Sequence, residues 1–424
     1  MDARANGRRR AWQRVKSMFQ RTQNINLSPI KTIELLASKI PDVISLAQGI
    51  PSFDTPEIVK RAAIKALNRG VVAKYSLAYG LYELREAIEQ KLAEDGMYYD
   101  FEKEIIAIAG SIEGITASLI SIIEPEKNEI IIFSPDYTSY SEAIKVAGGK
   151  PVFVNLTEPA YSQRDDWKID FNDLKAKINS RTAAIMFSNP NNPTGAIFTK
   201  DDLLKIAELA AGANALLISD EVYKDFLYAE IGKEKMFSLA QIPELRKKVI
   251  RIFSFSKAYS MAGWRIGFLH SDEENINEIL KVHDSLVTCA PVIAQHAAMA
   301  ALDFGGEEII KFVNEFKNRR EIMLNYLSEL SDFFECQSPL GSYYVFPKIK
   351  FKPKHKIVLD VLTQRQIDSP SWQVALDLLY GAKVAVVPGQ AFGPAGENHI
   401  RLSFGRSRKD IEQGMARIIK YLKQ

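Results

Sequence analysis

Short apolar runs alternate with segments of helical periodicity up to about residue 300. Runs rich in β-branched residues predict buried strands at 105–109, 129–133, 151–154, 182–187, 215–218, 249–253 and 265–269. Between them lie helical patterns such as 201–212, which ends at a glycine suited to a C-cap. Strands that alternate with helices predict an α/β fold with a mostly parallel sheet covered on both faces.

The pattern changes after about residue 300. A long charged helical stretch at 307–330 precedes strand-like segments at 342–346, 384–387 and 399–404, and a helix closes the chain. This α+β character predicts a second, smaller domain. We expect a large domain at 60–303, a small domain built from 27–59 together with 304–424, and a basic tail at 1–26.

Amino-acid composition mainly excludes classes of protein and partner. The 424 residues leave room for two domains, and 46% hydrophobic with 25% charged residues is typical of a soluble globular protein. A net charge of +3 is too small to favour nucleic acid or an anionic membrane as a partner, and no apolar run approaches the roughly 18 residues of a membrane span. Cys289 and Cys336 are too far apart for a metal motif and predict a reducing compartment, the cytoplasm. The five histidines are scattered, so no metal site is expected.

The N-terminus is the one strongly biased segment. Residues 1–22 carry seven Arg and Lys residues against Asp2 alone. Such a start resembles an organellar transit peptide, but it is short and weakly amphipathic. We favour a solvated, disordered tail.

Polar residues follow several predicted strands, at the edge where parallel sheets bind ligands. The segment 110–114 (GSIEG) leads into a helix, whose N-terminus suits a phosphate, although glycine there is also ordinary turn chemistry. The segment 188–195 (SNPNNPTG) predicts a rigid polar loop or a plain Asx/Pro turn. Asp220 ends a buried strand, which requires a cationic partner unless it caps a helix.

Lys257 follows another strand of this set, and Arg265 lies eight residues further on. A partly desolvated lysine loses affinity for its proton and becomes a nucleophile toward carbonyls. An arginine fork can clamp a phosphate. A lysine anchor, an acidic partner for a ring nitrogen and a phosphate cradle are together what a pyridoxal phosphate site needs.

Seven motifs in order carry a resemblance to a known family: AQGIPSFDTP (47–56), KYSLAYGLYELREAI (74–88), SPDYTSY (134–140), SNPNNPTG (188–195), SDEVYKDFLY (219–228), SFSKAYSMAGWRIGF (254–268) and HIRLSFG (399–405). From about residue 27 onward the chain resembles the class I/II pyridoxal-phosphate-dependent aminotransferases of fold type I. The resemblance implies a seven-stranded mixed sheet in which 265–269 runs antiparallel. It also implies a homodimer whose active sites are shared between subunits.

The resemblance also implies roles for individual residues. Lys257 would bind the cofactor covalently and act as acid and base, Asp220 would hold the ring nitrogen, and Asn192 and Tyr223 would hydrogen-bond the ring oxygen. The remaining implied contacts are Tyr137 stacked on the ring; Ser111, Ile112, Ser254, Arg265 and the partner subunit's Tyr75 on the phosphate; and Arg401 with Gly49 on the substrate carboxylate. Asn192 is also expected to bind the substrate.

The implied activity moves an amino group between an L-amino acid and a 2-oxo acid, with 2-oxoglutarate as acceptor, by a ping-pong mechanism. A pyridoxal-phosphate-dependent carbon–sulfur β-lyase is the alternative, but relatives of that kind tend to have histidine at the position of Tyr223. A cofactor-sensing regulator would need a DNA-binding module, and 26 residues cannot hold one. Ile50, Tyr75, Tyr79, Tyr137 and the loop 341–344 are expected to line a rather apolar substrate pocket, which leaves the amino acid open.

Overall fold

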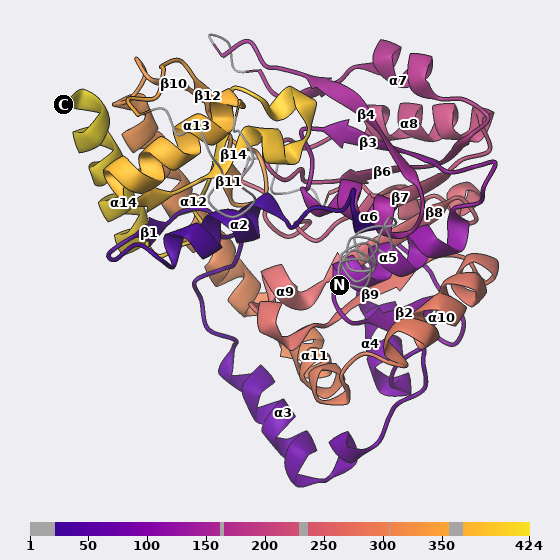
Figure 1. Cartoon of the computed structure of the whole chain (residues 1–424). Helices are drawn as coiled ribbons and strands as arrows, with labels where there is room; N and C mark the ends of the chain where they lie inside the picture. The colour runs from indigo at the N-terminus through magenta and orange to yellow at the C-terminus, as the bar shows by residue number, and fades with distance from the viewer. Residues whose placement is uncertain (1–21, 162–164, 229–235, 305, 356–367) are drawn as a thin grey trace, which may run out of the picture.

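A computed structural model describes residues 22–161, 165–228, 236–304, 306–355 and 368–424 (Figure 1). Most of the predicted basic tail at 1–26 lies outside these residues, because the description begins at Thr22. Within the described part, no helix is both long and apolar enough to cross a membrane.

A mixed, eight-stranded sheet forms the centre of the molecule (Figure 1). Its order is β2 (Ile105–Ile108), β9 (Gly267–His270), β8 (Val249–Ser254), β7 (Leu216–Asp220), β6 (Thr182–Ser188), β3 (Glu129–Ser134), β4 (Lys150–Thr157) and β5 (Lys168–Ile169). Strand β9 runs antiparallel to both of its neighbours, as expected for the segment 265–269. Strands β8, β7, β6, β3 and β4 pair in parallel.

The inner strands are apolar on both faces because helices cover both sides. Along β3, Ile130 and Ile132 face one layer of helices, while Ile131 and Phe133 belong to the core on the other face. The first layer contains α5 (Ser111–Ile122), α6 (Ser139–Val146) and α10 (Glu273–Val287). The opposite core takes in α4 (Tyr82–Glu94), α7 (Phe171–Lys177), α8 (Lys200–Gly212) and α11 (Val292–Phe304), with α3 (Glu57–Asn68) packed on α11.

The C-terminal part combines small sheets with helices beside one end of the central sheet (Figure 1). Its strands are β10 (Phe334–Glu335), β11 (Tyr344–Val345), β12 (Lys348–Ile349), β13 (Val384–Ala385), β14 (Val387–Pro388) and β15 (Ile400–Ser403). Its helices are α12 (Gly306–Ser328), α13 (Pro370–Asp377) and α14 (Arg408–Lys423). The early elements α2 (Pro29–Ala37) and β1 (Ile44–Ser45) join it, since β1 pairs with β13.

Single-turn helices and other short helical segments lie in the connections. They are η3 (Val71–Ala73), η5 (Leu239–Gln241), η6 (Pro243–Leu245), α9 (Phe255–Ala258), η7 (Ala262–Trp264), η8 (Leu378–Ala382), η9 (Gly389–Phe392) and η10 (Pro394–Gly396). Two of them, α9 and η9, lie next to the site described below.

Three details differ from the sequence-based expectations. The sheet has eight strands rather than seven, because the two residues of β5 add to the edge beside β4. The predicted strand at 384–387 is two strands, of which β13 pairs with β1 and β14 pairs with β15. Gly212 is the last residue of α8 rather than its cap; the left-handed residue after the helix is Asn214, with φ 51°.

Candidate active site

The polar strand ends predicted from sequence meet at one edge of the sheet. Strands β2, β3, β6, β7 and β8 all end there, because β2 and β8 are both antiparallel to the β9 strand between them. The loop after β6, the end of β7 and the turn after β8 carry Asn192, Asp220 and Lys257. This is the edge at which open α/β sheets bind ligands.

Lys257 lies in the single turn α9, which Ser254 caps by accepting a hydrogen bond from the backbone of Ser256. Its Nζ donates to the carbonyl oxygen of Gly49 over 2.7 Å. Burial, followed by the charge of Arg401, lowers the pKa of Lys257 to about 8, although the charge of Asp220 opposes this. A much larger fraction of the amine than in an ordinary lysine is therefore uncharged and nucleophilic near neutral pH.

Asp220 is 3% exposed at the end of β7. Its Oδ2 accepts a hydrogen bond of 2.7 Å from the hydroxyl of Tyr140 on α6, and its Oδ1 accepts one of 3.3 Å from the backbone of Val222. Burial raises the pKa of Asp220 to about 6, and the hydrogen bond from Tyr140 opposes the rise. Such a carboxylate is strongly stabilised by any cationic group that approaches it.

Arg401, on β15, is 1% exposed. Its Nη1 donates to Oδ1 of Asn192 over 2.9 Å, and its Nη2 donates to the carbonyl oxygen of Ala47 over 2.5 Å. The ring centroids of Tyr344 and Phe392 lie 4.2 and 5.1 Å from the guanidinium carbon. Its Nε has no hydrogen-bond partner among the described residues, so this buried cation retains a donor for a further acceptor.

A cluster of tyrosines surrounds Lys257. The hydroxyls of Tyr223 and Tyr344 lie 2.8 Å apart, and the hydroxyl of Tyr343 donates to the carbonyl oxygen of Gly49 over 2.9 Å. Burial raises the pKa of Tyr223 well above its usual value, with further contributions from Tyr344 and Tyr343. All three phenols therefore stay protonated and can donate hydrogen bonds. A Cβ on Gly49 would lie 2.1 Å from the Tyr344 hydroxyl, so any other residue here would displace Tyr344.

The N-terminus of α5 forms a cradle with Arg265. Ser111 and Ile112 open this helix, and the first backbone N–H groups of a helix have no partner within it. Arg265 lies across Gly110 and donates through Nη2 to the carbonyl oxygen of Ala109 over 3.3 Å. A Cβ on Gly110 would meet this guanidinium at 2.2 Å. Free amide donors, a helix dipole and a guanidinium fit the phosphate group of pyridoxal phosphate.

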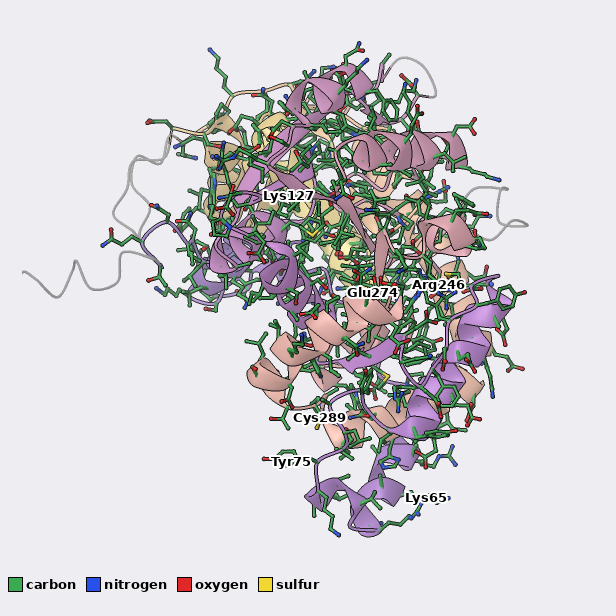
Figure 2. The ribbon with its side chains drawn as sticks, turned by 90° about the vertical axis from the view of Figure 1, so that its right-hand side faces the viewer. Lys65, Tyr75, Lys127, Arg246, Glu274 and Cys289 are labelled. Atoms are coloured by element: carbon green, nitrogen blue, oxygen red, sulfur yellow. The ribbon has the colours of Figure 1, made fainter. Side chains whose placement is uncertain are left out.

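Of the remaining predicted aromatic residues, Tyr137 is half-buried and Tyr75 is exposed. Tyr137 is half-buried at the start of the segment that leads into α6, with its ring 5.4 Å from that of Tyr140. Tyr75 is 83% exposed and points away from the rest of its own chain (Figure 2). A single chain therefore does not bring Tyr75 to the site. The hydroxyl of Tyr79 donates to Asn277 on α10 over 3.1 Å.

Sequence reasoning missed the contact between Tyr140 and Asp220. Tyr140 stands in the quoted motif SPDYTSY, three residues after Tyr137, but nothing in the sequence shows that α6 reaches across to the end of β7. It also missed the carbonyl oxygen of Ala47 as a partner of Arg401. Backbone acceptors leave no signal in the residue type, so only the structure could identify this one.

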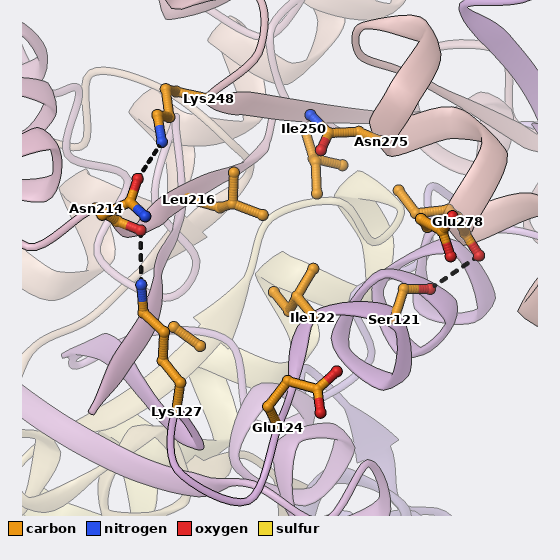
Figure 3. A pocket seen from close by; sticks show the side chains of 12 residues that line it. Ser121, Ile122, Glu124, Lys127, Asn214, Leu216, Lys248, Ile250, Asn275 and Glu278 are labelled. Atoms are coloured by element: carbon orange, nitrogen blue, oxygen red, sulfur yellow. Dashed lines mark hydrogen bonds between the residues drawn. The ribbon is translucent and has the colours of Figure 1, made fainter. Parts of the chain in front are cut away.

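A hollow of 360 Å³ lies near the opposite edge of the sheet, where strands begin (Figure 3). Leu216 and Ile250 line it, and Lys127 and Lys248 both donate to Asn214 on one wall. Within the described part, its lining includes none of the predicted site residues. The candidate site is therefore the cluster around Lys257.

Comparisons with known proteins agree with this geometry. The family model described as aminotransferase class I and II matches residues 41–418. The chain is 33% identical to an aspartate aminotransferase of Pyrococcus abyssi and 32% identical to aromatic-amino-acid aminotransferase 2 of Thermococcus litoralis, covering 96% of this chain and 99% of each relative. The solved structure of aspartate aminotransferase from Thermus thermophilus with maleate superposes with a TM-score of 0.81 at 30% identity, covering 95% of this chain and 98% of that one.

The match extends over nearly the whole described chain and includes every motif around Lys257. The buried lysine, the buried carboxylate and the helix N-terminus with its arginine, which the sequence predicts as parts of one site, all lie within the matched residues. The chain therefore belongs to the class I and II aminotransferase family and is a pyridoxal-phosphate-dependent aminotransferase.

Proposed function

We propose that the protein transfers an amino group from an L-amino acid to a 2-oxo acid by a ping-pong mechanism, with 2-oxoglutarate as acceptor. The observation that carries the proposal is the position of Lys257, whose pKa responds to the charges of both Arg401 and Asp220. Its amine therefore lies close enough to feel both a cation suited to a substrate carboxylate and a carboxylate suited to the cofactor ring.

The residues around Lys257 fit the cofactor in the following way. Lys257 would hold it covalently and Asp220 would pair with the protonated ring nitrogen, while the hydroxyl of Tyr140 orients that carboxylate. The other contacts are Asn192 and Tyr223 with the ring oxygen, Tyr137 on the ring face, and Ser111, Ile112, Ser254 and Arg265 around the phosphate. The hydroxyl of Ser254 is now 2.8 Å from that of Ser256, so it would turn toward the phosphate.

Bound pyridoxal phosphate supplies an electron sink for negative charge at the substrate α-carbon. Lys257 would carry out the proton transfer: its Nζ would remove the α-proton of the bound amino acid and would return that proton on the cofactor side. A pKa near 8 suits this exchange, because such an amine both accepts and donates a proton near neutral pH. Tyr223 keeps its own proton and donates a hydrogen bond that stabilises negative charge.

Arg401 binds the α-carboxylate of both substrates, assisted by the backbone N–H of Gly49. In this proposal one carboxylate site serves both substrates in turn, which is the reason for a ping-pong mechanism. A dicarboxylate acceptor is supported by the maleate in the Thermus relative and by the name of the Pyrococcus relative. The aromatic rings of Tyr344 and Phe392 lie beside Arg401. These apolar surfaces suit an amino-acid substrate with an uncharged side chain equally well.

We further propose a homodimer with shared active sites, located in the cytoplasm. The chain would divide into a large domain at 60–303 and a small domain at 27–59 with 304–424. The exposed aromatic ring of Tyr75 and the exposed side chain of Leu77 beside it support an interface at this place. Two free thiols, Cys289 and Cys336, are consistent with a reducing compartment.

The direct test of the activity is a half-reaction screen. Each L-amino acid is mixed with the cofactor-loaded enzyme, and loss of the visible absorbance of the cofactor reports amino-group transfer. Re-addition of 2-oxoglutarate should restore the absorbance. If no amino acid changes the spectrum, or if the amino acid is consumed with release of ammonia, the proposed transfer is wrong.

Borohydride reduction should fix the pyridoxyl group on Lys257 alone. Lys224 is the informative control, because burial disfavours its charged form but the carboxylates of Asp225 and Asp95 outweigh burial and raise its pKa. It therefore stays protonated and unreactive. Peptide mapping after reduction should find the label on Lys257, the Lys224→Ala variant should still take it up, and Lys257→Ala should not. Label on Lys224 would contradict the assignment.

Arg401→Lys should lower kcat/KM for amino acids by about a hundredfold, because the charge remains but the planar fork is lost. The affinity for pyridoxal phosphate should change little. Arg417→Lys is a matched control, since this arginine lies on α14 and donates to the carbonyl oxygen of Asp42. Steady-state kinetics and cofactor titration check both values. An equal fall in cofactor affinity would show that Arg401 does not act on the substrate.

A further inference from the structure

Asp136, directly after β3 and cis-Pro135, is a buried carboxylate without a cationic partner among the described residues. It is 2% exposed, and its hydrogen bonds come from neutral donors. The hydroxyl of Ser188 donates to Oδ1 over 2.5 Å, the backbone of Tyr137 donates to Oδ1 over 2.7 Å, and the backbone of Ser188 donates to Oδ2 over 3.3 Å.

Such a group is unfavourable for stability. Burial, together with the charge of Asp220 nearby, raises the pKa of Asp136 to about 8, even though hydrogen bonds from Ser188 and Tyr137 oppose the rise. An apolar residue of similar size would avoid this desolvation. A contribution to folding stability therefore does not explain why a carboxyl group is present at position 136. Its shortest hydrogen bond is the one that it accepts from the hydroxyl of Ser188.

The hydrogen bond to Asp136 fixes the orientation of the Ser188 hydroxyl, which also binds the loop after β6. Because Ser188 donates to Asp136, its lone pairs face the loop after β6, where Oγ accepts from the backbone N–H of Asn192 over 3.2 Å and from Nδ2 of Asn191 over 3.4 Å. Oδ1 of Asn192 in turn accepts from Nη1 of Arg401 over 2.9 Å. One chain of hydrogen bonds thus runs from Asp136 through Ser188 and Asn192 to Arg401.

A second connection reaches the same arginine. The backbone N–H of Asp136 donates to the carbonyl oxygen of Phe392 over 2.9 Å, and the ring of Phe392 lies 5.1 Å from the guanidinium of Arg401. Asp136 is therefore tied to two groups that fix this guanidinium, although it does not touch the arginine itself. Of these two connections, only the one through Ser188 depends on the Asp136 side chain.

We propose that Asp136 is a positioning residue for the substrate carboxylate: it orients the hydroxyl of Ser188, which holds Asn192 and, through it, the guanidinium of Arg401. The inference rests on the proposed role of Arg401. Without the acceptor at Asp136, the Ser188 hydroxyl turns to other acceptors, and its lone pairs then turn away from the N–H groups of Asn192 and Asn191 that it now binds. The cost falls on substrate binding more than on proton transfer at Lys257.

The test is a single-turnover half-reaction with L-phenylalanine and with L-aspartate, which separates the donor's apparent dissociation constant from the limiting rate. Asp136→Ala and Ser188→Ala should each raise the dissociation constant of the preferred donor about tenfold, the scale of one lost hydrogen bond to a charged network. The limiting rate and the cofactor affinity should stay within about threefold. The double variant should be no worse than either single one, because both act through one chain.

Two matched variants sharpen the result. Asp136→Asn keeps an oxygen for Ser188 and Tyr137 and loses only the 3.3 Å contact, so it should stay within about threefold of the parent. Thr138→Ala removes another buried hydroxyl of the same turn, one that has no partner among the described residues, and should change nothing. If Asp136→Ala does not fold, Ser188→Ala carries the test, since it breaks the chain and leaves the carboxyl group in place.

The outcomes separate this inference from the proposed function. If Arg401→Lys weakens donor binding but Asp136→Ala and Ser188→Ala do not, the positioning role is wrong and the proposed function stands. If Arg401→Lys leaves donor binding unchanged, the carboxylate site itself is wrong. Equal effects of Thr138→Ala, or a loss of cofactor affinity as large as the loss of donor affinity, would also overturn the positioning role.

Discussion

Asp220→Ala should reduce transamination at least about a hundredfold, the scale for loss of one preorganised electrostatic partner. The carboxyl group ends β7 with 3% exposure, and the hydroxyl of Tyr140 fixes its orientation over 2.7 Å. In the proposed site it keeps the ring nitrogen of the cofactor protonated. Alanine leaves that nitrogen without its partner, so the ring withdraws electrons less strongly from the substrate α-carbon.

Asp220→Ala should lower activity but should not lower the stability of the apoenzyme. Burial raises the pKa of Asp220 to about 6 in the chain without cofactor, above the ordinary value of 3.8. A carboxyl group with a raised folded-state pKa destabilises the fold as pH rises through that pKa, because ionisation is then easier in the unfolded chain. At pH 7 the apoenzyme of Asp220→Ala should thus melt no lower than the parent, yet gain less in Tm when pyridoxal phosphate is added.

Asp225→Ala is the matched control for both measurements. It removes a nearby carboxylate that pairs with Lys224, which keeps Asp95 as a second partner. Turnover and the cofactor-dependent rise in Tm should remain close to those of the parent. If Asp220→Ala also retained near-normal turnover, Asp220 would have only a structural role at the end of β7.

The strand ends illustrate what the sequence can predict. Strands β3, β6, β7 and β8 are apolar runs bounded by polar loops, so their existence and the polar edge after them follow from local pattern. Position in the motif order then places Lys257 and Asp220 at that edge. The hydrophobic pattern is reliable here because helices cover both faces of these strands.

Contacts between distant segments were not predictable in the same way. In the sequence pattern Tyr140 looks like an ordinary buried residue of α6, and its partner Asp220 lies 80 residues further along the chain. The segment 384–387 has a strand pattern, but its division into β13 and β14 depends on two different partner strands. Residue type records burial and propensity, whereas these features depend on tertiary pairing.

Tyr75 raises the question of subunit sharing. Its side chain is 83% exposed, lies in the stretch after η3 and points away from the rest of its own chain (Figure 2). The neighbouring Leu77 is 73% exposed. An aromatic and a leucine presented together to solvent favour burial against another surface. In the proposed homodimer this surface is the second copy of the chain, and Tyr75 would contact the phosphate cradle of its neighbour.

Mixing Tyr75→Ala with Lys257→Ala subunits should therefore restore activity that both parents lack. If each site takes Lys257 from one chain and Tyr75 from the other, one site of every mixed dimer carries both defects and the other carries none. Random exchange makes about half of the dimers mixed, so activity should return to about a quarter of that of the wild type. Activity is followed by transamination after subunit exchange, with mixed dimers verified by native mass.

If Tyr75 acts within its own chain, the same mixing experiment should give a different activity. If Tyr75 served the lysine of its own chain, every site of a mixed dimer would keep one defect, and the mixture would be no more active than its parents. Tyr98→Ala is the matched control, because this tyrosine is also largely exposed, at 73%, and has no predicted role in the site. It should be active alone, and mixing it with Lys257→Ala should give no gain beyond dilution. A gain specific to Tyr75→Ala requires that an active site be completed across the dimer, since no arrangement within one chain lets two inactive subunits produce an intact site.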